Sequence, residues 1–193
     1  MAVFAERVVA LTGETKTHAA SLPLLDPRSA DEETMTLETT LKQWNADLIN
    51  DEGLPGSVAQ EFIDTDWFGL PPATEEEIGA AETRLGVRLP ASYREFLLFA
   101  NGWVYPGNDM DFPGSLRSCS EIGWFKDEDA DWIRAWIDTD PGIPVSDDEY
   151  FVYGDDQDPV IMRREYLASC LKISESSEGG VYLLNPNVLR VCS

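Results

Sequence analysis

The sequence predicts an α+β fold: a helical hairpin packed on a meandering antiparallel sheet, with an extra helical N-terminal segment. Residues 71–102 carry the start and stop signals of two helices joined by a short turn. Beyond residue 115, short apolar runs alternate with turn signals, which is typical of antiparallel strands. Residues 1–67 show helical spacings interrupted by linker-like composition. We therefore expect residues 68–193 to form the main domain.

The N-terminal segment, residues 1–67, is expected to contribute short helices. Apolar residues recur near its start at the spacing of an amphipathic helix, namely Val3, Phe4, Val8 and Leu11. A stretch containing Pro, Ser and Asp then predicts a linker. A second helix is expected from about Leu37 to Ile49, and a helical turn is expected through the sequence VAQEFI to Asp64.

The first helix of the hairpin is predicted to begin at a capping box. Thr74 precedes Glu77 at the spacing that lets each side chain bind the other residue's backbone N–H. Acidic residues in this first turn also suit the positive end of the helix dipole. The apolar face of the helix is predicted to contain Ile78, Ala81 and Leu85. Gly86 is expected to end the helix, because glycine readily adopts the left-handed backbone of a C-cap.

The second helix of the hairpin is expected to begin at Pro90, because proline is preorganised for a first helical turn. Its buried side is predicted to contain Tyr93, Phe96, Leu97 and Ala100. Asn101 and Gly102 both tolerate a left-handed backbone, and they are expected to end the helix.

The rest of the chain predicts the sheet. We expect a strand near Leu116, then a short helix through EIGWF into the acidic run around Trp132 and Trp136. Further strands are predicted at YFVYG, PVIMR, LASCLKI and VYLLN. Turn signals at residues 154–159 and 178–180 separate these strands, so a meandering sheet is expected.

The net charge excludes several classes of partner. Lys and Arg total 14 against 36 for Asp and Glu, which gives a formal net charge of −22. Such a field repels the phosphates of nucleic acids and anionic membrane surfaces, and it accelerates the encounter with a basic protein. We therefore expect a protein partner, no direct binding to nucleic acid and no membrane association.

Residues that support common catalytic and metal sites are scarce. His18 is the only histidine, which removes most Ser/His and Cys/His schemes. The cysteines are widely spaced and form no CxxC pair: Cys119, Cys170 and Cys192. Neither a disulfide framework nor a zinc site is predicted, and no cofactor is expected. Without a secretory signal or a long apolar run, the chain is predicted to be cytoplasmic.

The stretch LPPATEEEIGAAETRLGVRLPASYREFLLFANGW resembles the signature of the SUKH superfamily, which includes bacterial toxin-immunity proteins and fungal regulators of cell-wall synthesis. The later EIGWF and VYLLNP are also similar to family segments, so the resemblance covers Phe68 to about Asn187. Family members usually continue well beyond the segment resembling VYLLNP, whereas only NVLRVCS follows here. The resemblance therefore leaves two alternatives, a variant of the domain that is short at its C-terminus or a chain that ends early through truncation.

The motif residues of this resemblance are Glu82, Gly86, Pro90, Tyr93, Phe96, Asn101 and Gly102. Helix capping and core packing explain most of them without a functional role. Glu82 has no second carboxylate or base at a workable spacing, so a hydrogen-bonding or helix-pairing role with Arg84 or Arg88 is favoured over catalysis. We assign these residues structural roles and predict no catalytic residue and no bound metal.

Two groups are candidates for contact with a partner. They are the post-hairpin loop with Trp103, Tyr105, Asp109 and Asp111, and the acidic run Asp127, Glu128 and Asp129. Trp and Tyr are frequent in binding hot spots, and acids beside them pair with Lys or Arg of a partner. The plainer alternatives are aromatic rings that cover the core and a solvated helix face. The acidic run does not follow the calcium-loop pattern.

The resemblance implies a non-catalytic binding protein, namely an immunity protein that neutralises a toxin by occlusion. Toxins that attack nucleic acid present basic surfaces, so the acidic composition favours a nuclease-type partner. The alternative that the resemblance leaves open is a scaffold or regulator of cell-wall synthesis and signalling.

Overall fold

The computed structural model describes residues 8–10, 36–50, 60–105, 114–139, 144–150, 152, 163–176 and 180–186. The helices are α1 (Leu37–Asn50), α2 (Gln60–Thr65), α3 (Glu75–Leu85), α4 (Ala91–Phe99), α5 (Phe125–Glu128), α6 (Ala130–Thr139), α7 (Asp147–Tyr150) and the 3-10 helix η2 (Arg164–Ser169). The strands are β1 (Val8–Ala10), β2 (Gly123–Trp124), β3 (Leu171–Lys172) and β4 (Tyr182–Leu184). The predicted α+β class is confirmed.

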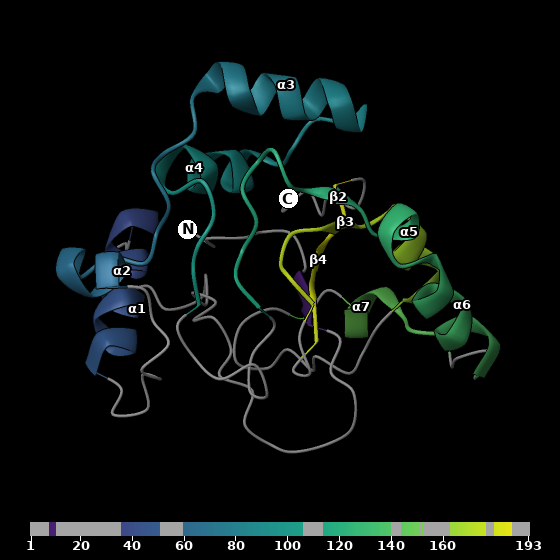
Figure 1. The fold of residues 1–193 in the computed structure, drawn as a ribbon. Coiled ribbons are helices and arrows are strands. Elements are labelled where there is room, and N and C mark those ends of the chain that lie inside the picture. Colours follow the sequence, from purple (N-terminus) through teal and green to yellow (C-terminus); the bar gives the residue numbers. More distant parts are fainter. Residues whose placement is uncertain are drawn as a thin grey trace.

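The strands form an antiparallel sheet in the order β1-β4-β3-β2. Leu171 of β3 lies opposite Leu184 of β4 on one side and opposite Trp124 of β2 on the other. The strand β1 pairs with the free edge of β4, where Val8 lies opposite Leu184. Figure 1 shows the hairpin of α3 and α4 above this sheet, with α1 and α2 to one side and α5 and α6 to the other.

Single bridges extend the sheet beyond these strands. Ser174 is bridged to Leu116, Leu116 to Trp103, and Trp103 to Gly69, all in antiparallel pairing. A backbone hydrogen bond from the Arg117 N–H to the Ile173 carbonyl keeps this ladder in register with β3. The segment after the hairpin is therefore part of the sheet, and it brings Trp103 and Arg117 close to the end of β3.

The two faces of the sheet pack into two apolar clusters, as the period of two along a strand requires. The residues that face the hairpin cluster are Leu171, Ile173, Tyr182 and Leu184. The residues that face α5, α6 and η2 are Cys170, Val181 and Leu183. The sheet therefore has helices on both sides.

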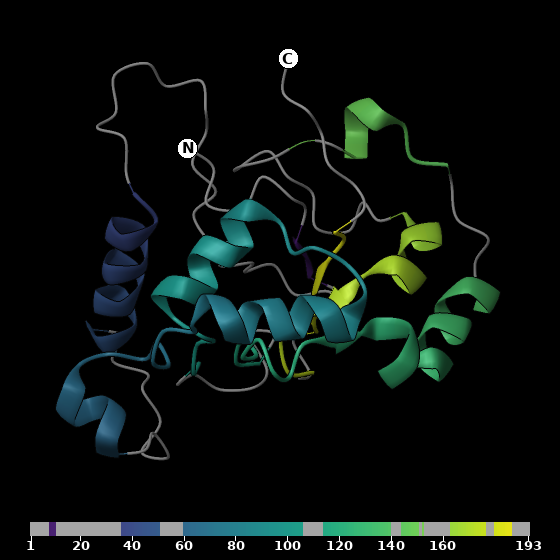
Figure 2. The same cartoon turned by 90° about the horizontal axis from the view of Figure 1, so that it is seen from above.

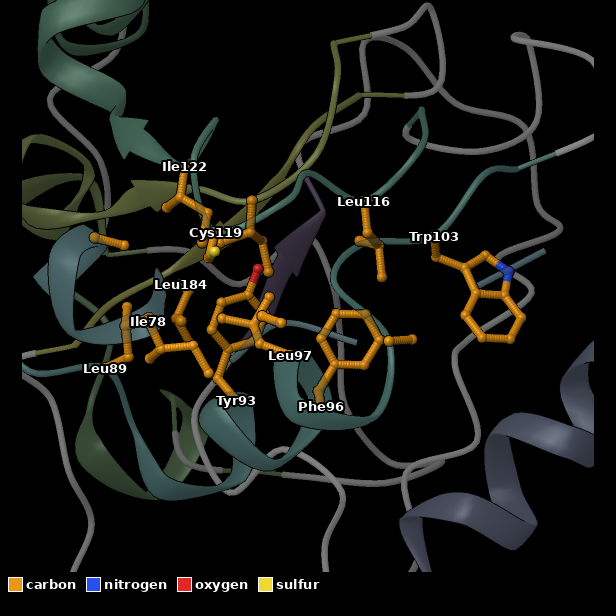
Figure 3. Packing of buried hydrophobic residues seen from close by; sticks show 14 of the residues in the cluster. Ile78, Leu89, Tyr93, Phe96, Leu97, Trp103, Leu116, Cys119, Ile122 and Leu184 are labelled. Atoms are coloured by element: carbon orange, nitrogen blue, oxygen red, sulfur yellow. The ribbon is translucent and has the colours of Figure 1, made fainter. Parts of the chain in front are cut away.

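The hairpin forms as its sequence predicts. Thr74 and Glu77 make the reciprocal bonds of a capping box, and Gly86 ends α3 in the left-handed conformation with φ 69°. Tyr93, Phe96 and Leu97 of α4 are completely buried. Figure 3 shows these three side chains directed toward Leu116, Ile122 and Leu184 of the sheet region.

The helix predicted for Leu37–Ile49 is confirmed as α1, and the turn predicted through VAQEFI is confirmed as α2. Helix α1 lies beside α4, as Figures 1 and 2 both show. Its Leu37 and Leu41 belong to the hairpin cluster, and Trp44 stacks on Trp103 with ring centroids 4.9 Å apart.

Several predicted elements are wrong. Residues 8–10 form strand β1 and not part of a helix, because pairing with β4 outweighs the local helical spacing. The sequence EIGWF is a turn followed by β2, and α5 begins only at its last residue, Phe125. In LASCLKI only Leu171 and Lys172 form a strand, because η2 occupies its first three residues.

The strands predicted at YFVYG and PVIMR and the C-cap predicted at Asn101 and Gly102 are not found in the described residues. Tyr150 of YFVYG ends the short helix α7, whereas PVIMR lies outside the described residues except for Arg163. Asn101 and Gly102 do not supply a left-handed C-cap, because α4 ends at an extended Ala100 with φ −146°. Gly102 has φ 107°, and a Cβ there would lie 2.8 Å from the Leu116 carbonyl oxygen. Close approach of the ladder explains this glycine.

Candidate partner-binding surface

The post-hairpin loop is only partly available to a partner. Trp103 is fully buried between Trp44 and Trp67, so it contributes to the core in this structure. Tyr105 is half-buried, and its backbone N–H donates to the Ser115 hydroxyl at 3.0 Å. Asp109 and Asp111 lie outside the described residues. Of the four loop residues, Tyr105 alone is therefore described with an accessible side chain.

The acidic run is divided by its contacts. Asp127 is exposed on α5. Glu128 accepts from Arg117 Nη1 at 2.8 Å, and Asp129 accepts from Lys172 Nζ at 2.7 Å. Of these three acids, Asp127 forms no ion pair with a described residue, whereas Glu128 and Asp129 are paired with Arg117 and Lys172.

We define the ionic cluster as Arg117, Glu128, Asp129, Lys172 and Glu175. Its cations are nearly buried, with exposed side-chain fractions of 10% for Arg117 and 7% for Lys172. The cluster joins α5 to the face of β3 that packs against α5 and α6. Because a buried charge is costly without a partner, each cation here is paired with two carboxylates.

The backbone makes room for this cluster at Gly123. A Cβ at this position would collide with the carboxylate of Glu128. Burial disfavours the charge of Arg117, but hydrogen bonds to Glu175 and Glu128 outweigh that effect. The pKa of the Arg117 guanidinium therefore lies above its ordinary value. Arg117 consequently keeps its positive charge inside the cluster.

A second polar contact joins the two helices of the hairpin. Glu82 of α3 accepts from the Leu89 N–H at 2.8 Å and pairs with Arg94 of α4 at 2.7 Å. Burial raises the pKa of the Glu82 carboxyl, but hydrogen bonds from Arg94 and Leu89 lower it by more, so the pKa lies below its ordinary value. The partner is Arg94, and not Arg84 or Arg88 as predicted.

The end of the hairpin is held to the following loop by side chains. Arg84 donates to the carbonyls of Ile122 at 2.8 Å and Cys119 at 3.0 Å. Asn101 accepts from the Cys119 N–H at 2.8 Å. Pro90 is buried immediately before α4. All these contacts are internal, and they explain the motif residues through the fold.

Most of the described Lys and Arg side chains form ion pairs with acidic side chains of the same chain. Those that form ion pairs are Lys42, Arg94, Arg117, Arg134, Arg163 and Lys172. Glu76 of α3 and Asp127 of α5 are exposed and form no ion pair with another described residue. These two carboxylates therefore add uncompensated negative charge to the described surface.

Other chemistry is limited in the described part of the chain. No three His, Cys, Asp or Glu side chains converge there as metal ligands. Burial raises the pKa of the Cys170 thiol to about 12, so this thiol is un-ionised at neutral pH and a poor nucleophile. None of the described helices combines the length and apolarity that a membrane crossing demands.

The fold and these contacts define an α+β domain in which a capped helical hairpin covers one face of a small antiparallel sheet. The chain belongs to the SMI1/KNR4 family (SUKH-1), whose model matches residues 72–189. This family includes immunity proteins, and its members are generally non-catalytic. Comparison with curated proteins and with solved structures gives no match.

Sequence reasoning missed the cationic half of the ionic cluster. Lys172 lies in the apolar run LASCLKI, where a single lysine in a predicted strand was an available signal for a buried ion pair. Asn45 was similarly visible as a polar residue on the apolar face of a predicted helix. Arg117 gave no local signal, because its partners are 11 and 58 residues away.

Proposed function

We propose that this protein is a non-catalytic binding protein that acts as an immunity protein and neutralises a basic, nuclease-type toxin by occlusion. Membership of the SUKH-1 family is the observation that carries this proposal. The excess of exposed acidic side chains supports it, since opposite charges steer two proteins together. The protein would act in the cytoplasm, where such a toxin reaches nucleic acid.

The proposed binding unit is the domain of residues 68–193, against which α1 and α2 of the segment 1–67 pack. Its contact surface would combine Asp127 with Tyr105 and the loop carrying Asp109 and Asp111. Glu128 and Asp129 would hold α5 in place through the ionic cluster. Inhibition requires only that the basic active-site surface of the toxin is covered, so no turnover is involved.

Co-expression with the toxin encoded by an adjacent gene tests the proposal. We expect restored growth of the host and a stable complex on co-purification. Asp127→Lys should slow association, whereas Asp148→Lys, the same change at an exposed acid of α7, should leave it near the parent rate. Normal toxicity and no complex would contradict the proposal and favour the scaffold alternative.

A further inference from the structure

Helix α1 is joined to the rest of the described structure by one polar residue. Asn45 is buried, with 5% of its surface exposed. Its side-chain amide donates to the Asp66 carbonyl at 2.7 Å and accepts from the Phe68 N–H at 2.9 Å. The two backbone groups lie on either side of Trp67, where a neighbouring strand would otherwise bind them. Asn45 therefore supplies the hydrogen bonds that these groups lack at the end of the sheet ladder.

The other polar contacts of α1 within the described residues stay inside or at the start of the helix. They are Thr36 with Thr39 and Thr40, Lys42 with Glu38, Gln43 with Asp47, and Asn50 with Ala46. No described ion pair joins α1 to another element. Its remaining attachment is apolar, through buried Leu37 and Leu41 and the partly buried Trp44, Leu48 and Ile49, of which Trp44 stacks on Trp103.

The surface beneath α1 carries an unsatisfied polar group. Trp103 is completely buried, and its indole Nε1 has no hydrogen-bond partner among the described residues. Leaving a buried N–H donor unpaired is unfavourable, since water would otherwise bind it. When α1 packs over Trp103, the unpaired N–H therefore offsets part of the favourable free energy of burying the Trp44, Trp67 and Trp103 rings. Figure 3 shows Trp103 at the border of the core, away from the hairpin residues.

We propose that α1 is a releasable strap: it covers the Trp67–Trp103 surface and the open end of the ladder in this structure, and it detaches as a unit while the hairpin stays folded. Release exposes the Trp103 ring beside the already partly exposed Trp67 ring, and it frees the Asp66 carbonyl and the Phe68 N–H. Such a surface fits an extended peptide segment with an apolar side chain. The strap would thus control whether Trp103 is available to a partner, and this inference does not depend on the toxin proposal.

The direct test is amide hydrogen exchange of the full chain, read by mass spectrometry. We expect amides of residues 37–50 to exchange at least about ten-fold faster than those of α3 and α4, because local opening requires less free energy than global unfolding. Equal exchange in both regions would overturn the proposal, since α1 would then open only with the whole domain.

Asn45→Ala sharpens this test, with Gln43→Ala on the exposed side of the same helix as its control. Losing two buried hydrogen bonds should accelerate exchange in residues 37–50 by about ten-fold or more, and the hairpin should be unaffected. Hydroxyl-radical footprinting should show several-fold more oxidation of Trp103 and none extra at Tyr93. Simultaneous change in both regions would contradict release as a unit.

Discussion

The two faces of the sheet are stabilised in different ways. On the hairpin side, Tyr93, Phe96 and Leu97 form a dry apolar contact with the strands. On the α5–α6 side, a smaller apolar cluster lies next to buried Lys172 and its carboxylate partners. Both faces are covered, but only one has charges inside its contact.

This difference indicates that one contact mainly stabilises the fold, whereas the other mainly positions α5. Apolar burial contributes most of the free energy of folding and tolerates many arrangements of similar volume. A buried ion pair contributes little net free energy, but it is favourable only in one geometry. The ionic cluster therefore fixes where α5 sits on β3, and this position determines where the exposed Asp127 of α5 points.

The largest expected effect is on the hairpin side. Phe96→Ala should lower the free energy of unfolding by about 3–5 kcal/mol, because it leaves a cavity at a site with no solvent access. Leu98→Ala in the same helix, where 37% of the residue is exposed, should cost below about 0.5 kcal/mol. Urea denaturation followed by circular dichroism measures both. Similar losses for the two variants would remove the distinction between the buried and exposed sides of α4.

A smaller but sharper effect is expected on the other face. Lys172→Ala should cost about 3 kcal/mol, because it leaves Asp129 without its buried partner. Arg134→Ala breaks an ion pair whose Arg side chain is 70% exposed, and it should cost at most about 0.5 kcal/mol.

The double variant Lys172→Met with Asp129→Asn tests the positioning role. Removing both charges should restore most of the lost free energy of unfolding, since the desolvation cost disappears with them. We expect the affinity for a partner to remain reduced if α5 is no longer fixed. Equal losses in Lys172→Ala and the double variant would contradict this expectation, because Met keeps most of the aliphatic length of Lys and the ion pair itself would then contribute the lost free energy.

The hairpin could be predicted from the sequence because its signals are local. Thr74 and Glu77 define one helix start, Gly86 defines the end of that helix, and the apolar spacing of α4 identifies its buried side. Each of these signals lies within a few residues of the feature that it specifies, so tertiary context was not needed.

The rest could not be predicted because its determinants are distant in the chain. Strand β1 is defined by its pairing with β4, in which Val8 lies opposite Leu184, a residue far away in the sequence. Asp129 and Lys172 are 43 residues apart. Trp103 was a candidate contact residue with core packing as the alternative, and its burial depends on Trp44 of α1. Long-range pairing decided each of these outcomes.

The smallest expected effect concerns the Glu82–Arg94 ion pair between the two helices of the hairpin, and it depends on pH. The folded-state pKa of Glu82 lies below its ordinary value of 4.5, so its ionised form stabilises the fold. This contribution is complete above pH 4.5 and is lost as the pH falls through the lower folded-state pKa. Glu82→Gln should therefore cost roughly 1 kcal/mol at pH 7 and progressively less in acid.

Glu76→Gln, at an exposed acid of the same helix, should show no such dependence. Unfolding free energies measured between pH 3 and pH 7 would decide: a Glu82→Gln deficit that stays constant over this range would mean that Glu82 acts through its shape and the Leu89 N–H, and not through its charge.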